Sequence, residues 1–202
     1  MDDHSRRHSP AAERNGPPIL AALQRLLPPS GVLLEIASGS GQHAAFCSAE
    51  LPGWRWQPSD YDAAALPSIA AWCADLTNVR PPITLNVLDT TWPGVPAQVD
   101  AVYCANMIHI APWACTAGLM RGAARHLAPQ GLLITYGPYL LADEPTTPSN
   151  LAFDADLRAR NPAWGIRRLA DVTAEAEAAG LHLRERIDMP ANNKLLVWAH
   201  AG

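Results

Sequence analysis

Residues 34–43 have the sequence Leu34-Glu35-Ile36-Ala37-Ser38-Gly39-Ser40-Gly41-Gln42-His43. The apolar run that begins at Val32 and ends before the glycines is typical of a short, buried strand in a parallel sheet. The two glycines allow a sharp turn that brings backbone N–H groups close to a ligand. Since residues 42–51 predict a helix, those N–H groups would lie at a helix N-terminus, which favours ligand binding.

Strand and helix patterns alternate along the rest of the chain. Further strands are predicted over residues 54–57, 83–87, 99–105, 131–136, 181–188 and 194–200, and helices from Pro17 to about residue 27, over 63–75 and 113–127, and before Gly180. Strands separated by helices predict a parallel sheet covered on both faces. The loop between the last two strands is too short for a crossover helix, so we expect an antiparallel pair.

The same patterns predict the domain organisation. Residues 139–165 are expected to be irregular with one short helix. No linker or repeat divides the chain, which predicts a single α/β domain over residues 13–202. A flexible N-terminal tail is expected over residues 1–12.

The composition narrows the class of protein. Of 202 residues, 49% are hydrophobic, which is compatible with a packed core. The net charge of −4 argues against a nucleic-acid binder with a wide basic face. The four cysteines lack a C-x-x-C pair and the histidines lack metal-ligand spacing, so we expect free thiols and no metal site. No signal segment or membrane span is apparent, so we expect a cytoplasmic protein without a membrane partner.

Acidic residues follow the second and third predicted strands. In an open α/β sheet, ligands bind beyond the carboxyl ends of the strands. Asp60 is placed to accept from both hydroxyls of a ribose, and Asp89 from an adenine amino group. Taken alone, Asp60 is typical of a helix cap and Asp89 of a turn. Their order after the glycine loop, one at each strand end, favours a nucleoside cofactor.

Two cofactors fit this order of residues. Gly39-x-Gly41-x-x-Ala44 matches the dinucleotide fingerprint in its alanine-ending variant, which indicates NAD. Against NAD, Glu35 would place a carboxylate beside a pyrophosphate, where like charges repel. Glu35 instead suits a ligand with an ammonium and a sulfonium, and residues 31–54 contain no Arg or Lys. We therefore expect S-adenosyl-L-methionine, with S-adenosyl-L-homocysteine as product. A nicotinamide-dependent oxidoreductase is the alternative, because a helix N-terminus alone can hold a pyrophosphate.

Residues 34–43 resemble the first motif of class I S-adenosylmethionine-dependent methyltransferases. The whole chain resembles one branch of them, domain-of-unknown-function family 938, or the methyltransferase-like protein 26 family. The matching stretches are residues 9–15, 56–60, 105–110, 136–138, 149–150, 161–167 and 189–193. The resemblance implies a Rossmann-like, seven-stranded sheet of order 3-2-1-4-5-7-6, with the last strand antiparallel and helices on both faces. It also implies a methyltransferase activity.

Strand-end position and resemblance together mark the candidate cofactor-binding residues. They are Arg14, Asn15, Glu35, Ala37, Gly39, Gly41, His43, Asp60, Tyr61, Asp89, Thr90, Asn106 and Met107. For Arg14 and Asn15, which would fold over the cofactor, a helix cap is the alternative interpretation. For His43, the alternative is a capping or packing residue.

The acceptor of the methyl group is expected to be a small molecule with an O, S or N nucleophile. The segment after the fourth strand, Asn106-Met107-Ile108-His109, is not an Asn/Asp-Pro-Pro-Tyr/Phe motif, and the charge balance is acidic. His109 is the candidate catalytic base, and a histidine that orients a loop is the alternative. Candidate acceptor-binding residues are His109, Trp113, Tyr136, Tyr139, Asn150, Trp164, Arg167, Asn192 and Asn193.

The role of Asn192 and Asn193 and the enzymatic activity of the whole chain each have an alternative interpretation. Asn192 and Asn193 are also typical of a simple hairpin turn. The whole chain is also compatible with a non-catalytic domain that keeps an S-adenosylmethionine site and acts through partners. The intact glycine loop and both acids weigh against decay of such a site.

Overall fold

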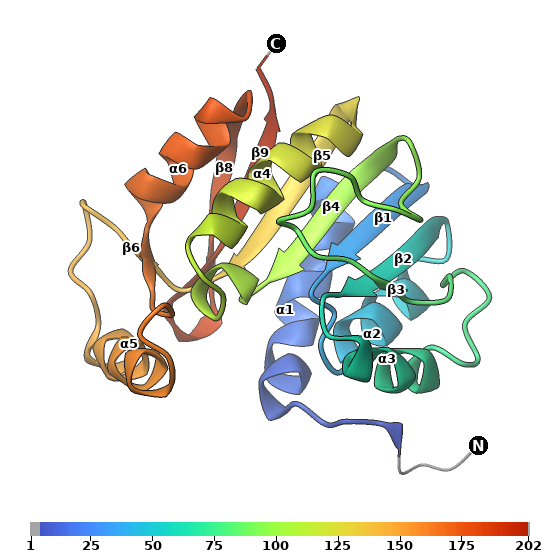
Figure 1. Cartoon of the computed structure of the whole chain (residues 1–202), viewed down its shortest axis with the longest axis horizontal. Coiled ribbons are helices and arrows are strands. Elements are labelled where there is room, and N and C mark those ends of the chain that lie inside the picture. The colour runs from blue at the N-terminus through green and yellow to red at the C-terminus, as the bar shows by residue number, and fades with distance from the viewer. Residues whose placement is uncertain (1–4, 202) are drawn as a thin grey trace.

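The computed structural model describes residues 5–201, which form a seven-stranded sheet between two layers of helices (Figure 1). The sheet has the order β3-β2-β1-β4-β5-β9-β8. Its strands are β1 (Gly31–Ile36), β2 (Trp54–Asp60), β3 (Ile83–Thr84), β4 (Val99–Ala105), β5 (Leu127–Gly137), β8 (Leu181–Met189) and β9 (Asn193–His200). Strands β3, β2, β1, β4 and β5 are parallel, and β9 runs antiparallel to both neighbours. The predicted strand order is confirmed, with β8 and β9 as sixth and seventh strands.

Helices cover both faces of this sheet. They are α1 (Pro10–Leu26), α2 (Gln42–Glu50), α3 (Leu66–Trp72), α4 (Ala114–His126), α5 (Pro148–Arg160) and α6 (Leu169–Ala178). The described residues also include the short 3-10 helices η2 (Ala63–Ala65), η3 (Met107–His109) and η4 (Pro190–Asn192). Adjacent residues of a strand face opposite sides, so Leu33 lies in the buried cluster that includes α1 and α2, while Leu34 lies in the cluster on the α4 side. Both faces of β1 are therefore buried, as its apolar run predicts.

The first helix begins earlier than the sequence predicted. Pro17 and Pro18 lie inside α1, and Ser9 is its N-cap, with an Oγ that accepts from the Ala12 N–H at 3.3 Å. Of the expected tail, residues 1–4 lie outside the described residues and residues 10–12 are helical. The Arg7 N–H donates to Ser68 Oγ at 2.8 Å, which ties the start of the described chain to α3.

The segment between β5 and α6 has more structure than predicted. β6 (Tyr139–Leu140) pairs in parallel with β7 (Arg167–Arg168) as a separate two-stranded sheet. Between them, α5 has 13 residues and is capped by Thr147, whose side chain accepts from the Asn150 N–H. Within residues 5–201, no helix combines the length and apolar character needed to cross a bilayer.

Candidate functional site

The loop after β1 is open on one side and closed on the other. Ala37, Gly39 and Gly41 all have positive φ angles, of 57°, 58° and 91°. A Cβ added to Gly41 would lie 2.6 Å from the Cα of Ile69 in α3, so this position requires glycine. A Cβ added to Gly39 would meet only the Ala37 carbonyl oxygen, at 4.0 Å. The loop therefore leaves space for a ligand at Gly39, as a cofactor cradle requires.

Asp60 joins this loop to the end of β2. Its Oδ2 accepts from the Gly39 N–H at 2.9 Å, and its Oδ1 accepts from the Asp62 N–H at 3.0 Å. The side chain is only 6% exposed, so its position is fixed before any ligand binds. Each carboxylate oxygen keeps a further lone pair for a ligand hydroxyl. The structure thus brings together the glycine loop and the acid that the sequence singled out.

Exposed apolar side chains follow three parallel strands at the same edge of the sheet. Tyr61 is 75% exposed directly after Asp60, Leu88 is 48% exposed in the segment after β3, and Ile110 is 43% exposed after η3. Large apolar side chains in contact with water at a strand-end crevice suit a ligand with a flat, apolar part.

Asp89 and Thr90 lie apart from the contacts of the glycine loop. The Asp89 N–H donates to the Asn86 carbonyl at 3.1 Å, so Asp89 lies in a turn. Both residues line a cavity of about 120 Å³ beside α4, which also includes Arg121 and Arg125.

Glu35 is buried beneath the glycine loop, between β1 and β2. It is 2% exposed, and its carboxylate accepts from Trp56 Nε1 at 2.8 Å. Burial raises the pKa of Glu35 to about 7, although the Trp56 hydrogen bond opposes this shift. The sequence predicts the buried strand but not the partner of this carboxylate, because Trp56 comes from another strand.

Asn15 connects α1 to α2 and the sheet. Its Oδ1 lies 2.6 Å from His43 Nε2, and its side chain also bonds the hydroxyl of Tyr136. His43 Nδ1 lies 3.4 Å from the hydroxyl of Tyr103, and burial lowers the pKa of His43 to about 4. Asn15 lies within α1, so its alternative interpretation as a helix cap is wrong. Arg14 is exposed on the same helix.

The segment after β4 is held in a strained turn. Asn106 has φ = 61°, and its N–H donates to the Tyr136 carbonyl at 2.8 Å. Met107 is buried in the core on the α4 side of the sheet. Left-handed backbone at non-glycine residues gathers at functional sites, and Ala37 after β1 shares this conformation.

His109 is buried, at 1% exposure, and its ring packs edge-on against Tyr139 with 4.9 Å between ring centroids. A Cβ added to Gly137 would lie 2.5 Å from its Nε2, so Gly137 covers the ring. Neither ring nitrogen makes a hydrogen bond of good geometry within the described residues. Burial and the charge of Arg167 lower the pKa of His109 to about 3. In this arrangement His109 is neutral and out of reach of solvent, which corresponds to the loop-orienting interpretation.

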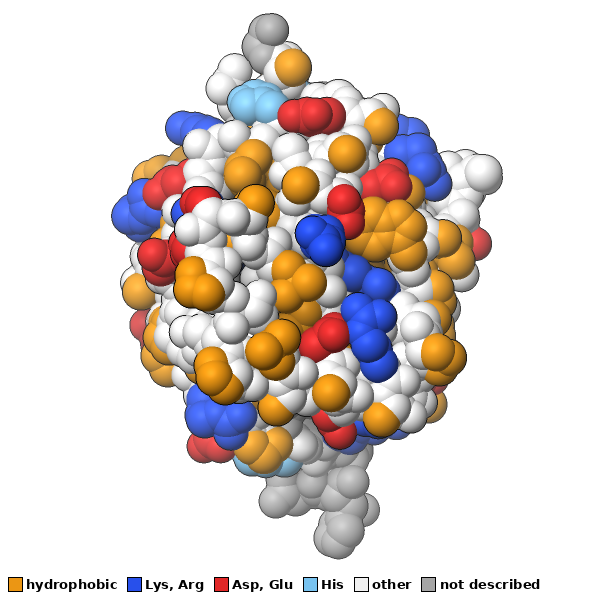
Figure 2. Space-filling model, turned by 90° about the vertical axis from the view of Figure 1, so that its left-hand side faces the viewer, with side chains coloured by type: hydrophobic (Ala, Val, Ile, Leu, Met, Phe, Trp, Pro, Cys, Tyr) orange, Lys and Arg blue, Asp and Glu red, His pale blue; other side chains and the backbone are white. Residues whose placement is uncertain are grey.

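Arg167 holds the same segment from outside. Its guanidinium donates to the carbonyls of Ile108 (3.1 Å), Ala111 (2.9 Å) and Ala163 (2.7 Å), and stacks over Trp113 at 5.6 Å. Arg167 and Trp113 belong to the wall of an open cleft of about 650 Å³ between α5, β7 and α6. Figure 2 views the molecule from this side, where Lys and Arg side chains gather near the centre beside acidic ones. Trp164 packs under Arg160, at 5.3 Å.

Two further candidate acceptor residues, Asn192 and Asn193, lie at the tip of the β8–β9 hairpin. Tyr139, Asn150 and Asn192 line one small cavity. Asn193 Nδ2 donates to the Pro190 carbonyl at 3.0 Å, so this side chain takes part in the hairpin turn.

Sequence reasoning missed two polar residues that support the glycine loop. Ser68 Oγ donates to the Ser40 carbonyl at 2.7 Å, and Gln42 Oε1 accepts from the Ser9 N–H. Gln42 stands in the quoted motif at the first position of α2, which was an available signal. Within residues 5–201, no three His, Cys, Asp or Glu side chains gather as metal ligands.

Comparison with known proteins agrees with this geometry. A family model described as "Protein of unknown function (DUF938)" matches residues 6–200. Human N-acetylserotonin methyltransferase in complex with S-adenosylmethionine is similar in structure, with a TM-score of 0.79 and 12% identity over 95% of this chain and 53% of that chain. An O-methyltransferase family 2 protein from Planctomyces limnophilus in complex with apigenin gives 0.76 and 18% identity over 95% and 58%.

CalO1, a methyltransferase in calicheamicin biosynthesis in its S-adenosylhomocysteine-bound form, gives a TM-score of 0.72 and 16% identity, covering 89% of this chain and 52% of that chain. The chain spans about half the length of these solved proteins. At such low sequence identity, the structural similarity shows a shared fold: this chain has a methyltransferase-like α/β fold.

Proposed function

The chain belongs to the DUF938 family of proteins of unknown function, and we propose that it is an S-adenosylmethionine-dependent methyltransferase acting on a small molecule. The observation that carries the proposal is the pair of hydrogen bonds made by Asp60. They fix a ribose-binding carboxylate against an open glycine loop at the carboxyl edge of the sheet.

The charge around this loop favours a cation over a pyrophosphate. Asp60 and Asp62 lie at the end of β2 and Glu35 lies beneath the loop, whereas residues 31–54 contain no Arg or Lys. A pyrophosphate would meet the Asp60 and Asp62 carboxylates as like charge, while a sulfonium and an ammonium are attracted to them. The residues present therefore fit S-adenosylmethionine better than a nicotinamide dinucleotide.

The protein's own contribution is binding and alignment. When bound, S-adenosylmethionine supplies a methyl group on a sulfonium, which is intrinsically reactive toward a nucleophile. We assign the ribose hydroxyls to Asp60, the adenine face to Tyr61 and the rim of the site to Asn106. Asp89 reaches the adenine amino group only if its turn opens toward the loop. Rigid placement of this kind accelerates transfer through proximity and orientation.

We assign His109 a positioning role. Its ring fills the space under Gly137 and its carbonyl accepts from the Gly165 N–H at 2.9 Å, so it joins the segment after β4 to the segment before β7. A role as general base would require exposure of the ring and a pKa nearer the working pH.

Calorimetric titration with S-adenosylmethionine, S-adenosylhomocysteine, NADH and NADPH tests this proposal. We expect both adenosyl compounds to bind at one site per chain and neither nicotinamide to bind. Binding of a nicotinamide alone would establish the oxidoreductase alternative. Transfer of a labelled methyl group to a panel of thiols, phenols and amines then separates an enzyme from a non-catalytic binding domain.

A further inference from the structure

A cavity of about 60 Å³ lies between the segment that joins β6 to α5, the start of α5 and the tip of the β8–β9 hairpin. Its wall includes Tyr139, Thr147, Asn150, Asn192 and Lys194. We propose that this cavity receives one end of the methyl acceptor, that this end is an uncharged hydrogen-bonding group, and that Lys194 is the positioning residue that holds the cavity wall. The inference rests on the proposed function and names the acceptor class for it.

The cavity lies at the same edge of the sheet as the glycine loop. Lys194 stands opposite Gly137, the last residue of β5, in the antiparallel β5–β9 register. Tyr139 packs on His109, and a Cβ added to Gly137 would lie 3.3 Å from Asn106 Oδ1. The cavity therefore adjoins the residues that follow β4. Since β4 separates β1 from β5, the cavity lies within a few strand spacings of the glycine loop, each about 4.8 Å.

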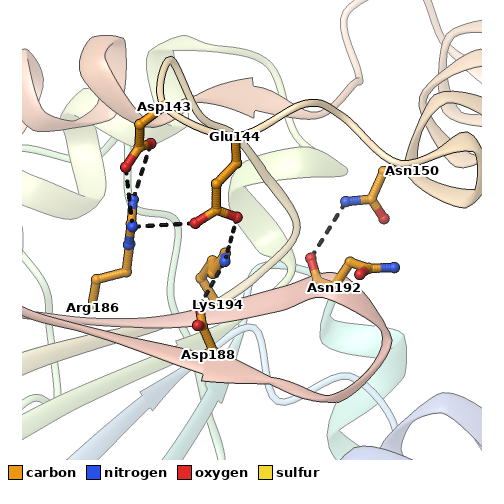
Figure 3. Close-up of polar contacts among 7 residues, drawn as sticks. All are labelled: Asp143, Glu144, Asn150, Arg186, Asp188, Asn192 and Lys194. Carbon is orange, nitrogen blue, oxygen red and sulfur yellow. Dashed lines mark hydrogen bonds and ion pairs between the residues drawn. The ribbon is translucent and has the colours of Figure 1, made fainter.

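Ion pairs pin the outer wall of the cavity to the hairpin (Figure 3). Lys194 Nζ donates to Glu144 Oε2 at 3.0 Å and to Asp188 Oδ1 at 2.6 Å. Arg186 Nη2 donates to the same Glu144 at 3.2 Å and to Asp143 at 3.3 Å. The Lys194 side chain is only 10% exposed, so its contacts are less screened than those of an ordinary surface pair. Glu144 is bonded by both cations, which makes it the point at which the segment is held.

Amide contacts hold the other side. Asn150 Nδ2 donates to the Asn192 carbonyl at 3.4 Å (Figure 3). Asn192 Nδ2 donates to Ser149 Oγ at 3.3 Å. Asn150 is 8% exposed although it lies at the start of an otherwise exposed helix. The Asn150 side chain lines the cavity, and its amide can both donate and accept hydrogen bonds.

The charges around the cavity select against an acid. Lys194 is the only lysine of the chain, and its ammonium already donates to two carboxylates. The pinning network holds two cations, Lys194 and Arg186, against three carboxylates, Asp143, Glu144 and Asp188. Of these five residues, Lys194 and Glu144 line the cavity and pair with each other at 3.0 Å, so the wall has no unpaired cation to offer a carboxylate or phosphate on the acceptor. Hydroxyl and amide groups of the wall instead suit an uncharged amide, hydroxyl or carbonyl.

A matched pair of fragments tests the acceptor class. We would titrate 4-hydroxybenzamide and 4-hydroxybenzoate into the full chain, with and without S-adenosylhomocysteine, by saturation-transfer NMR. The two compounds differ only in one group, which is an uncharged amide in the first and a carboxylate in the second. We expect the amide to bind about tenfold more tightly, and Asn150→Ala to remove most of this preference. Equal or tighter binding of the carboxylate, no binding of the amide, or an unchanged preference in Asn150→Ala would overturn the assignment.

Variants of the pinning network test the positioning role. Lys194→Met should weaken binding of the amide about five- to tenfold and speed proteolytic cleavage within residues 141–147, while Lys194→Arg should retain wild-type binding. Arg25→Met, which breaks the exposed 2.7 Å pair between Arg25 of α1 and Glu185 of β8, is the matched control and should change neither. If Lys194→Met does not fold, Glu144→Gln carries the test, because Glu144 lies outside the sheet. Wild-type binding in Glu144→Gln would remove the positioning role.

The two proposals fail in distinguishable ways. Every variant of the network should bind S-adenosylhomocysteine with wild-type affinity in calorimetry. A wild-type chain that does not bind this compound refutes the proposed function. Loss of the expected fragment preference with cofactor binding intact refutes only the cavity assignment, and the titration without S-adenosylhomocysteine measures the cavity alone.

Discussion

Asp60→Ala removes the carboxylate that connects the glycine loop to the end of β2. In the structure this side chain accepts two backbone N–H groups, from Gly39 at 2.9 Å and from Asp62 at 3.0 Å. The substitution therefore acts twice: it leaves the loop without its anchor, and it removes the acceptor that we assign to the ribose hydroxyls.

The size of each effect follows from the contacts. A hydrogen bond to a charged group contributes roughly 1.5–3 kcal/mol. Loss of one such hydrogen bond to the ribose should weaken cofactor binding roughly 10- to 150-fold. Loss of the two backbone contacts lowers the free energy of unfolding by about 1–3 kcal/mol, because both N–H groups can turn to water once the loop loosens.

Calorimetric titration of S-adenosylhomocysteine measures the first effect and chemical denaturation the second. The affinity and stability of Asp60→Asn should fall between those of wild type and Asp60→Ala. The single amide oxygen of asparagine can accept only some of the hydrogen bonds that the two carboxylate oxygens accept. Asp62→Asn is the matched control, because the Asp62 side chain accepts from the Ala64 N–H and not from the loop. A folded Asp60→Ala chain with wild-type affinity would refute the assignment of the ribose to Asp60.

Three further substitutions test other parts of the structure. The pKa of Glu35 is raised from 4.5 to about 7 in the folded chain, so its contribution to stability is lost as pH rises through about 7. Wild type should therefore lose about 3 kcal/mol of unfolding free energy between pH 4.5 and pH 8 that Glu35→Gln does not lose. If the difference between the two proteins did not change with pH, the burial argument would be contradicted. Gly41→Ala should lower the thermal midpoint clearly, because a Cβ there lies 2.6 Å from the Ile69 backbone; an unchanged midpoint would show that α3 yields freely. Tyr61→Ala should weaken S-adenosylhomocysteine binding several-fold at unchanged stability, since the ring is 75% exposed, and unchanged affinity would remove its role at the adenine.

The sheet was predictable because its strands are apolar runs with clear ends. The predicted strand over residues 99–105 has the bounds of β4, and Gly180 ends α6 in the left-handed conformation that a C′ glycine favours. β3 is shorter than predicted, since only Ile83 and Thr84 pair with β2 before the chain turns at Asn86–Asp89. Alternation of side chains alone does not show where pairing stops.

Two helices differ from the prediction, for different reasons. α5 buries only Asn150 and Leu157, so it has no apolar stripe for the sequence to reveal, although Thr147 followed by a proline was a helix-start signal. The predicted start of α1 is too late because Pro17-Pro18 also matches a helix start. In the structure Ser9 is the N-cap, Pro10 begins the helix, and Pro17 and Pro18 lie inside it.

The order of candidate site residues was predictable, and the residues that pack against them were not. Gly39 and Asp60 meet as the strand-end rule expects. Glu35 and His109 are buried by Trp56 and by Gly137, which come from distant parts of the sequence. Burial of this kind depends on tertiary packing, so chain order does not reveal it.

A crystal structure of the chain with S-adenosylhomocysteine addresses the central claim most directly. We predict the ligand at the carboxyl edge of β1 and β2, with both ribose hydroxyls on the Asp60 carboxylate and the Gly39 backbone against it. A ligand bound elsewhere, or a structure in which Asp60 keeps only its two backbone contacts while the ligand bypasses the loop, would contradict the assignment.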